Sequence, residues 1–223
     1  MNVSEAVRRR MSARAFLEKP VATETIVRAL EKAARAPSGG NLQPWHVAVV
    51  NGDRMSEFRA IMEKRLAGEA IDGGETAEYA VYPPNLKEPY RTRRFQNGEE
   101  MYATLGIARE DRPARLKRFA ENFRFFGAPA AIFCFVDRVM GAPQWSDLGM
   151  FLQTFLLLLT EEGLDTCAQE CWAAYPRTVA EFCGMDRELM LFCGMAIGYR
   201  DETAAVNRMV STRAPASEWL KVL

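Results

Sequence analysis

The stretch from 145 to 162 constrains the fold most, because a helix there is apolar on nearly all of its sides. Such a helix has to be buried, either in a core or in a subunit interface. Its longest apolar run covers 148–159, is interrupted by Gln153 and Thr154, and is shorter than the roughly 20 residues that a membrane-spanning helix needs. We therefore expect a globular chain built around this helix, without a membrane span.

The rest of the sequence predicts helices and strands around it. Helices fit 3–10, 23–34, 53–70, 115–126 and 177–183, and strands fit 46–50, 130–136, 165–171 and 190–199. The run 46–50 alternates too little for a half-exposed strand, so we expect it to be buried. Residues 71–112 combine glycine pairs, prolines and tyrosines without periodicity, which is typical of a lid or substrate-binding segment. The prediction is one α+β domain over 1–223, with an irregular segment at 71–112 and an unpatterned tail from 201.

Charge and residue counts exclude several function classes. With 29 basic and 29 acidic residues, the chain lacks the positive footprint of a nucleic-acid-binding protein. Five cysteines and no signal peptide indicate free thiols in a reducing compartment, so we expect a cytoplasmic protein. The single histidine, His46, excludes sites that need two and is expected in a core or an interface. The sequence holds no zinc-binding cysteine pairs, P-loop, dinucleotide fingerprint or nucleophile elbow, so reactive chemistry is expected from a bound cofactor.

Two short polar motifs carry the candidate chemistry. The first is Arg10-Met11-Ser12-Ala13-Arg14, in which two cations flank a hydroxyl; this set can hold a phosphate and a second anionic or carbonyl group. A solvated basic helix is the alternative. The second motif, 36–45, has glycines that let the backbone approach a ligand, together with the polar side chains of Ser38, Asn41 and Gln43. An ordinary turn is the alternative there.

In this order and roughly 25 residues apart, the two motifs resemble the FMN-dependent nitroreductase family. The family pattern is an R-x-S-x-[RK] segment, a helix, and then P-S-x-x-N-x-Q-P-W leading into a strand. Weaker agreement continues at 163–165, at Gln169-Glu170, at Gly198 and at 211–215, so the resemblance covers nearly the whole chain. It implies a nitroreductase-like fold, with helices around a mixed or antiparallel sheet. It also implies a homodimer with the C-terminal tail on the partner and the flavin sites between subunits.

The resemblance implies roles for individual residues. Arg10 and Arg213 bind the FMN phosphate, and Ser12 holds the ribityl chain or the phosphate. Arg14 lies near the pyrimidine end of the flavin and stabilises its reduced form, while backbone amides near Gln169 face the reactive N5. The 37–41 loop reaches the flavin from the partner subunit. The implied cofactor-binding set is Arg10, Met11, Ser12, Arg14, Pro37, Ser38, Gly39, Asn41, Asn85, Gln169, Glu170 and Arg213.

Two positions in that set carry alternatives. Ser211 stands where many relatives have a second cation, so Arg208 or Arg9 is a candidate substitute at the phosphate. Asn85 is the candidate contact for the flavin pyrimidine, with Lys87 or Arg94 as alternatives. It is also an ordinary turn residue after two prolines. For Glu170, the alternative is a strand residue that points to solvent.

The function implied is an FMN-dependent oxidoreductase that uses NADH or NADPH to reduce nitroaromatic or quinone-like acceptors by a ping-pong exchange. Hydride transfer needs no side-chain base, so we expect no catalytic side chain and no metal. The alternatives are a flavin storage or sensing protein and a reductive dehalogenase or flavin-fragmenting enzyme. The arginines at 91, 93 and 94 favour a carboxylate- or nitro-bearing substrate. The aromatic residues expected to wall the pocket are Tyr79, Tyr82, Tyr90, Tyr102, Phe123, Phe125 and Phe126.

Overall fold

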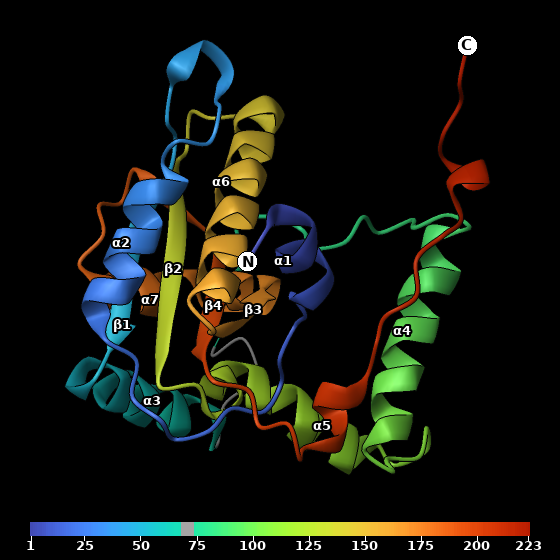
Figure 1. The fold of residues 1–223 in the computed structure, drawn as a ribbon. Coiled ribbons are helices and arrows are strands. Elements are labelled where there is room, and N and C mark those ends of the chain that lie inside the picture. Colours follow the sequence, from blue (N-terminus) through green and yellow to red (C-terminus); the bar gives the residue numbers. More distant parts are fainter. Residues whose placement is uncertain (68–73) are drawn as a thin grey trace.

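In the computed structural model, which describes residues 1–67 and 74–223, a single antiparallel sheet lies at the centre of the chain (Figure 1). The strand order is β1-β2-β4-β3, with β1 at His46–Asn51, β2 at Ala130–Asp137, β3 at Asp165–Gln169 and β4 at Leu189–Gly198. Seven α-helices are described: α1 (Val3–Arg9), α2 (Thr23–Ala33), α3 (Asp53–Leu66), α4 (Tyr90–Thr104), α5 (Arg112–Ala120), α6 (Ala142–Glu161) and α7 (Pro176–Cys183). The predicted α+β fold is confirmed, and the sheet is antiparallel.

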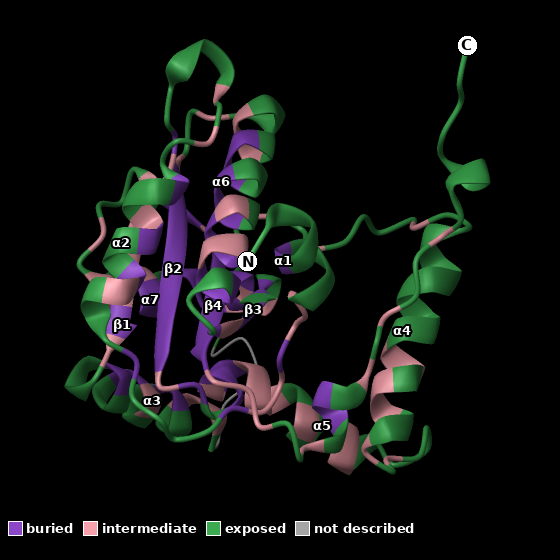
Figure 2. Cartoon of the chain, viewed as in Figure 1, coloured by how far each residue is buried: buried purple, intermediate pink, exposed green. Residues whose placement is uncertain are grey.

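The sheet carries a hydrophobic core on each face, because its central strands alternate between the two sides. In β2, Ile132 and Cys134 pack into the core shared with α2 and α6, whereas Phe133 and Phe135 pack into the core on the α3 and α7 side. Val49, Ile132 and Met195 are register partners across three strands and join the first of these cores. Figure 2 shows β2 buried along its length. Two covered faces explain why the 130–136 run is continuously apolar.

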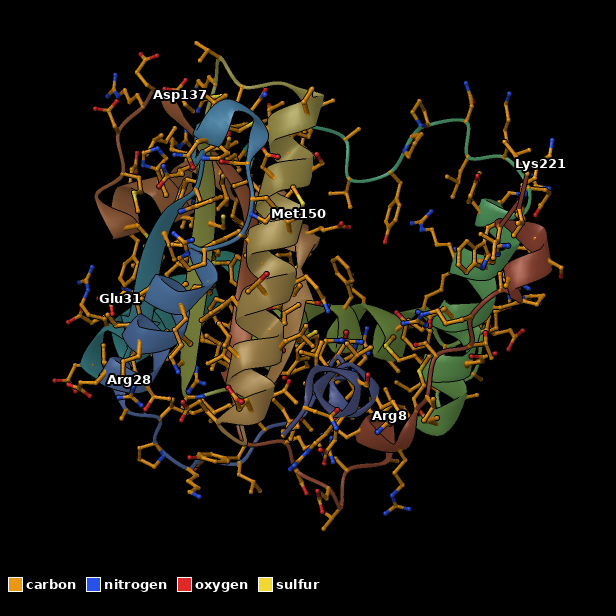
Figure 3. The ribbon with its side chains drawn as sticks, turned by 45° about the horizontal axis from the view of Figure 1, so that its top comes forward. Arg8, Arg28, Glu31, Asp137, Met150 and Lys221 are labelled. Carbon is orange, nitrogen blue, oxygen red and sulfur yellow. The ribbon has the colours of Figure 1, made fainter. Side chains whose placement is uncertain are left out.

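Helix α6 is confirmed as the long apolar helix, and it buries one side. Leu148, Phe151 and Phe155 recur at helical spacing and are 0 to 1 % exposed, and the Phe151 ring stacks on Trp45 with 4.8 Å between ring centroids. Met150, labelled on α6 in Figure 3, is 39 % exposed. In the single chain, therefore, the side of α6 that carries Met150 stays open. Among the described residues, no helix is long and apolar enough to cross a membrane.

Several predicted elements need correction. Residues 71–112 are not irregular throughout, because the 15-residue helix α4 occupies 90–104. None of its residues is buried, so it has no apolar face for the sequence to reveal. The helix expected at 115–126 begins earlier, where Asp111 caps α5 by accepting from the Ala114 N–H, and residues 121–127 form a 3₁₀ segment instead. The predictions for 68–70 and 71–73 lie outside the described residues.

Strand β1 is half-buried and not fully buried, because it lies at the edge of the sheet. His46, at its start, is exposed in the single chain, so of its two expected places the core is wrong and a subunit interface stays a prediction. Strand β3 ends at Gln169, and the predicted residues 170 and 171 belong to the 3₁₀ segment Glu170–Ala174. All five cysteines are free, as predicted.

Helix α4 and the tail from 209 to 223 form an arm that stands beside the main body (Figure 1). The two parts of the arm hold each other through an Arg93–Glu218 ion pair and a 2.8 Å hydrogen bond from the Ser211 hydroxyl to Asn97. Arg115 of α5 ties the arm to the body with two bonds to the Glu99 carboxylate, at 2.6 and 2.8 Å. The arm buries little, and Figure 2 shows it exposed or intermediate throughout.

Candidate functional site

The segment after α1 extends the sheet beyond β3 and so fixes the first motif. Ser12 forms a parallel bridge with Thr166, and the Ala13 N–H donates to the Thr166 carbonyl at 2.9 Å. Further on, the Leu17 N–H donates to the Tyr199 carbonyl at 2.8 Å. These main-chain bonds hold the Arg10–Arg14 motif against the outer edge of β3. The motif is therefore not a free basic helix end.

Asn207 clamps this segment from the C-terminal part of the chain. Its Oδ1 accepts from the Arg14 N–H at 2.7 Å, and its Nδ2 donates to the carbonyls of Ala15 and Asp201, both at 2.8 Å. The Asn207 side chain is buried and its amide is fully used. Sequence reasoning missed this residue because nothing in the unpatterned tail distinguishes it. It fixes the backbone from which the Arg14 side chain projects.

Arg10 and Arg213 come together although 203 positions separate them in the sequence. Burial lowers the pKa of Arg10, and the nearby Arg213 cation lowers it further. Within the described part of the chain, neither side chain has a carboxylate partner, and Arg213 donates only to the carbonyls of Ser211 and Thr212. Two like charges near each other without a counter-ion can hold an anion.

A second pair of cations consists of Arg14 and Arg118. Arg118 Nη2 donates to the Arg14 carbonyl at 2.9 Å, and its guanidinium lies 5.1 Å from the centre of the Phe126 ring. Burial lowers the pKa of Arg118, Glu121 opposes this, and Arg14 lowers it further. Arg118 Nε is buried without a hydrogen-bond partner in the described residues. Sequence reasoning missed Arg118, whose helical setting gives no sign of its destination.

Cys167 links the two pairs of cations. Burial raises the pKa of this thiol, while the charges of Arg14, Arg118 and Arg10 act in the opposite direction. All three arginines therefore lie near the middle of β3. The structure thus brings Arg10, Ser12, Arg14 and Arg118 to one edge of the sheet, and Arg213 of the tail lies near enough to Arg10 to lower its pKa.

A cavity of about 540 Å³ opens where β3 ends. Gln169 lies at this end, but its side chain turns inward, donating to the Asn122 carbonyl at 2.7 Å and accepting from Trp172 Nε1 at 3.4 Å. This leaves the main chain as the natural contact at that position. Glu170 is exposed, yet the surrounding protein still desolvates its carboxyl and raises its pKa. The cavity is also lined by Tyr79, Tyr82, Arg94, Phe119 and Cys171.

The loop of the second motif lies elsewhere in the chain. The Gly39 N–H donates to the buried Asp147 carboxylate at 3.1 Å, near the start of α6. Helix α1, which leads to Arg10, shares a groove with Leu158 near the end of α6. Eleven residues separate these points on α6, which is about 16 Å along a helix. Within one chain, Pro37, Ser38, Gly39 and Asn41 are thus not brought to the arginines.

The remaining predicted residues divide between the cavity and other places. Asn85 is exposed in a separate cavity of about 960 Å³ on the arm, with Lys87, and does not line the one at β3. The two candidate substitutes at the phosphate have other neighbours: Arg208 donates to the Thr203 carbonyl, and the charge of Arg9 acts on the Asp165 carboxylate. Of the predicted aromatic wall, only Tyr79 and Tyr82 line the β3 cavity. The others are core, exposed or packed under another side chain: Phe123, Phe125 and Phe126 are buried, Tyr90 is 60 % exposed, and Tyr102 lies under Arg115.

The sequence model of the nitroreductase family matches residues 7–199. This chain belongs to the nitroreductase family. It is 33 % identical to a 4-nitrobenzoate reductase of Pseudomonas putida over 93 % of this chain and 89 % of the relative. It is 31 % identical to a nitrobenzene nitroreductase of Ectopseudomonas oleovorans, over 97 % and 95 %.

Among solved structures, the chain is similar to an FMN and NADPH-dependent nitroreductase, NfnB, of Sphigopyxis sp. strain HMH. The TM-score is 0.94 at 45 % identity, covering 100 % of this chain and 99 % of that one. The family and the fold predicted from the two motifs are therefore confirmed. The roles of the individual site residues stay predictions.

Proposed function

We propose that this protein is an FMN-dependent oxidoreductase that uses NAD(P)H to reduce nitroaromatic or quinone-like acceptors. The observation that carries the proposal is the gathering of Arg10, Arg14 and Arg118 beside β3, with Arg213 near Arg10 and no carboxylate counter-ion for Arg10 or Arg213 in the described residues. The similar NfnB structure is described as FMN and NADPH-dependent, and the relatives are named for nitroaromatic reduction.

The residues fit FMN from its phosphate to its ring. Arg10 and Arg213 supply the paired positive charge that a phosphate dianion requires, and Ser12 adds a hydroxyl from the segment that carries Arg10. Arg14 and Arg118 supply positive charge where the pyrimidine end of the ring would lie, which favours the reduced, anionic flavin. Gln169 and Glu170 line the cavity where the reacting edge would lie. When bound, FMN supplies the hydride-accepting and hydride-donating chemistry.

The cavity itself supplies little reactive chemistry. The Tyr79 hydroxyl donates to the Phe192 carbonyl, and burial raises its pKa well above the ordinary value. Burial also raises the pKa of the Cys171 thiol, so a nucleophilic thiolate is disfavoured there. These side chains therefore shape the cavity and exclude water from it. NAD(P)H and the acceptor occupy this cavity one after the other. This is the ping-pong exchange expected for a single cavity.

We further propose that the active form is a homodimer. The 37–41 loop cannot reach the arginines of its own chain, so it completes the site of a partner copy. The open side of α6 with Met150, and the tail with Trp219 at 69 % exposure, are the surfaces that a partner would cover. The chain then acts as one domain in which the described part of the 71–112 segment, residues 74–112, covers the substrate. Free thiols support a cytoplasmic location.

Initial-rate kinetics test the proposed function. Steady NADPH oxidation that depends on a nitroaromatic acceptor, with parallel double-reciprocal lines as the acceptor is varied, is the expected result. Intersecting lines would contradict the ping-pong exchange. Bound flavin without acceptor-dependent turnover would instead indicate storage or sensing, and halide release from a halogenated aromatic would indicate dehalogenation.

A further inference from the structure

Helix α4 carries three arginines whose partners differ. Arg91 pairs with Glu88 at 2.7 Å, and Arg93 pairs with Glu218 of the tail. Arg94 has no carboxylate partner anywhere in the part of the chain that the structure describes. Its guanidinium instead lies over the Tyr82 ring, 3.8 Å from the ring centre. One cation of the cluster is thus held in place and left without a counter-ion.

Arg94 is also the member of this cluster that lines the cavity at the end of β3. Tyr82 lines the same cavity, so the stacked pair forms part of its wall, as do Gln169 and Glu170. The titratable groups that line this cavity are Arg94, Tyr79, Tyr82, Glu170 and Cys171. Burial raises the pKa values of Tyr79 and Cys171 and so keeps both side chains neutral at ordinary pH, which leaves Arg94 and Glu170 as the charged groups of this lining. Among the described residues that line the cavity, Arg94 is the cation available to an anionic ligand.

The chemistry of a stacked guanidinium defines what binds there. Stacking uses the face of the group and leaves its in-plane N–H donors free, in the fork geometry that matches a carboxylate. We propose that Arg94 binds the carboxylate of an aromatic acceptor, so that nitroaromatic acids are preferred to neutral nitroaromatics; this inference rests on the proposed function. The acceptor then lies with its carboxylate on the arm and its nitro group toward the end of β3. The relatives are named for both kinds of substrate, so their names do not decide between them.

The test compares 4-nitrobenzoate with its neutral methyl ester. The acid-to-ester ratio of kcat/KM is measured for the natural protein and for Arg94→Gln. Comparing this ratio between the two proteins removes the difference in intrinsic reactivity between the acceptors. We expect the ratio to fall about tenfold or more in Arg94→Gln, corresponding to about 1.4 kcal/mol. Arg94→Lys keeps the charge but loses the fork, so an intermediate ratio is expected.

Controls separate the outcomes. Arg112→Gln removes an exposed arginine of the next helix that lines no part of this cavity, and should leave the ratio unchanged. An unchanged ratio in Arg94→Gln would overturn the inference while leaving the proposed function intact. A rise in KM for NADPH but not NADH, with the acceptor ratio unchanged, would also overturn it, because the anion recognised would be the 2′-phosphate. A natural protein that reduces neither acceptor would instead contradict the proposed function.

Discussion

Replacing Asn207 tests how the Arg14 segment is held. Asn207→Ala removes three hydrogen bonds, of 2.7, 2.8 and 2.8 Å, from a buried position that ties Arg14 and Ala15 to Asp201. At about 1 kcal/mol for each bond, the free energy of unfolding should fall by about 3 kcal/mol. With a urea m-value of about 3 kcal/mol/M, the unfolding midpoint should fall by about 1 M. The affinity for FMN should fall as well, because the backbone of Arg14 is no longer fixed.

Asn207→Asp and Asn97→Ala complete this experiment. The aspartate keeps an acceptor for the Arg14 N–H but removes both donors and buries a charge, so it should destabilise at least as much as alanine. Asn97 is on the exposed arm and accepts a single bond from Ser211, so its loss should cost less than about 0.5 kcal/mol. Unfolding is followed at one protein concentration, since association shifts the midpoint. If Asn207→Ala and Asn97→Ala shifted the midpoint equally, the clamp would be refuted.

Three further predictions follow from the site and from one surface ion pair. Arg118→Gln should weaken FMN binding about tenfold in a fluorescence titration, while Arg118→Lys stays close to the natural protein; equal affinity in all three would contradict a role for this charge. Asp147→Ala should lower the free energy of unfolding by about 1 to 2 kcal/mol. It should also weaken FMN binding, although Asp147 lies far from Arg10 in its own chain, because the Gly39 loop would no longer be held for the partner's site. Unchanged FMN affinity would argue against a shared site. The hydrogen bond from Arg124 lowers the pKa of Glu63, so the stabilisation from this ion pair is present above about pH 4.5 and is lost as pH falls through the lower folded pKa. The urea midpoints of the natural protein and Glu63→Gln should therefore converge on acidification. A difference between the midpoints that does not depend on pH would show that the pair does not contribute.

The elements that the sequence predicts well are those with a buried face. Strand β2 and helix α6 pack against cores, so the spacing of their apolar residues alone reveals them. Helix α4 buries nothing, and its sequence therefore resembles a loop. Phe125 and Phe126 adopt φ values of 53° and 54° in the 3₁₀ segment, a backbone shape that an apolar pattern does not announce. Their burial in the core, not in the pocket, follows from that local bend.

In the candidate site, residues close together in the sequence could be predicted, and residues brought in by the tertiary fold could not. Arg10, Ser12 and Arg14 are close in the sequence, so a local motif reveals them. Arg118 and Asn207 contact the Arg14 segment from 104 and 193 residues away, and only the tertiary fold brings them there. Arg94 is one of three arginines that the sequence does not distinguish. The ion pairs of Arg91 and Arg93 are what set it apart.

The measurement that tests the central claim most directly is the visible spectrum of the purified protein, followed anaerobically as NADPH is added. We expect flavin bands corresponding to one FMN per chain that bleach with NADPH and return when a nitroaromatic is added. We also expect the double variant Arg10→Gln, Arg213→Gln to lose the flavin and to retain the fold, as judged by circular dichroism. A colourless protein that does not take up added FMN, or a double variant that keeps its flavin, would contradict the claim that these arginines form an FMN site.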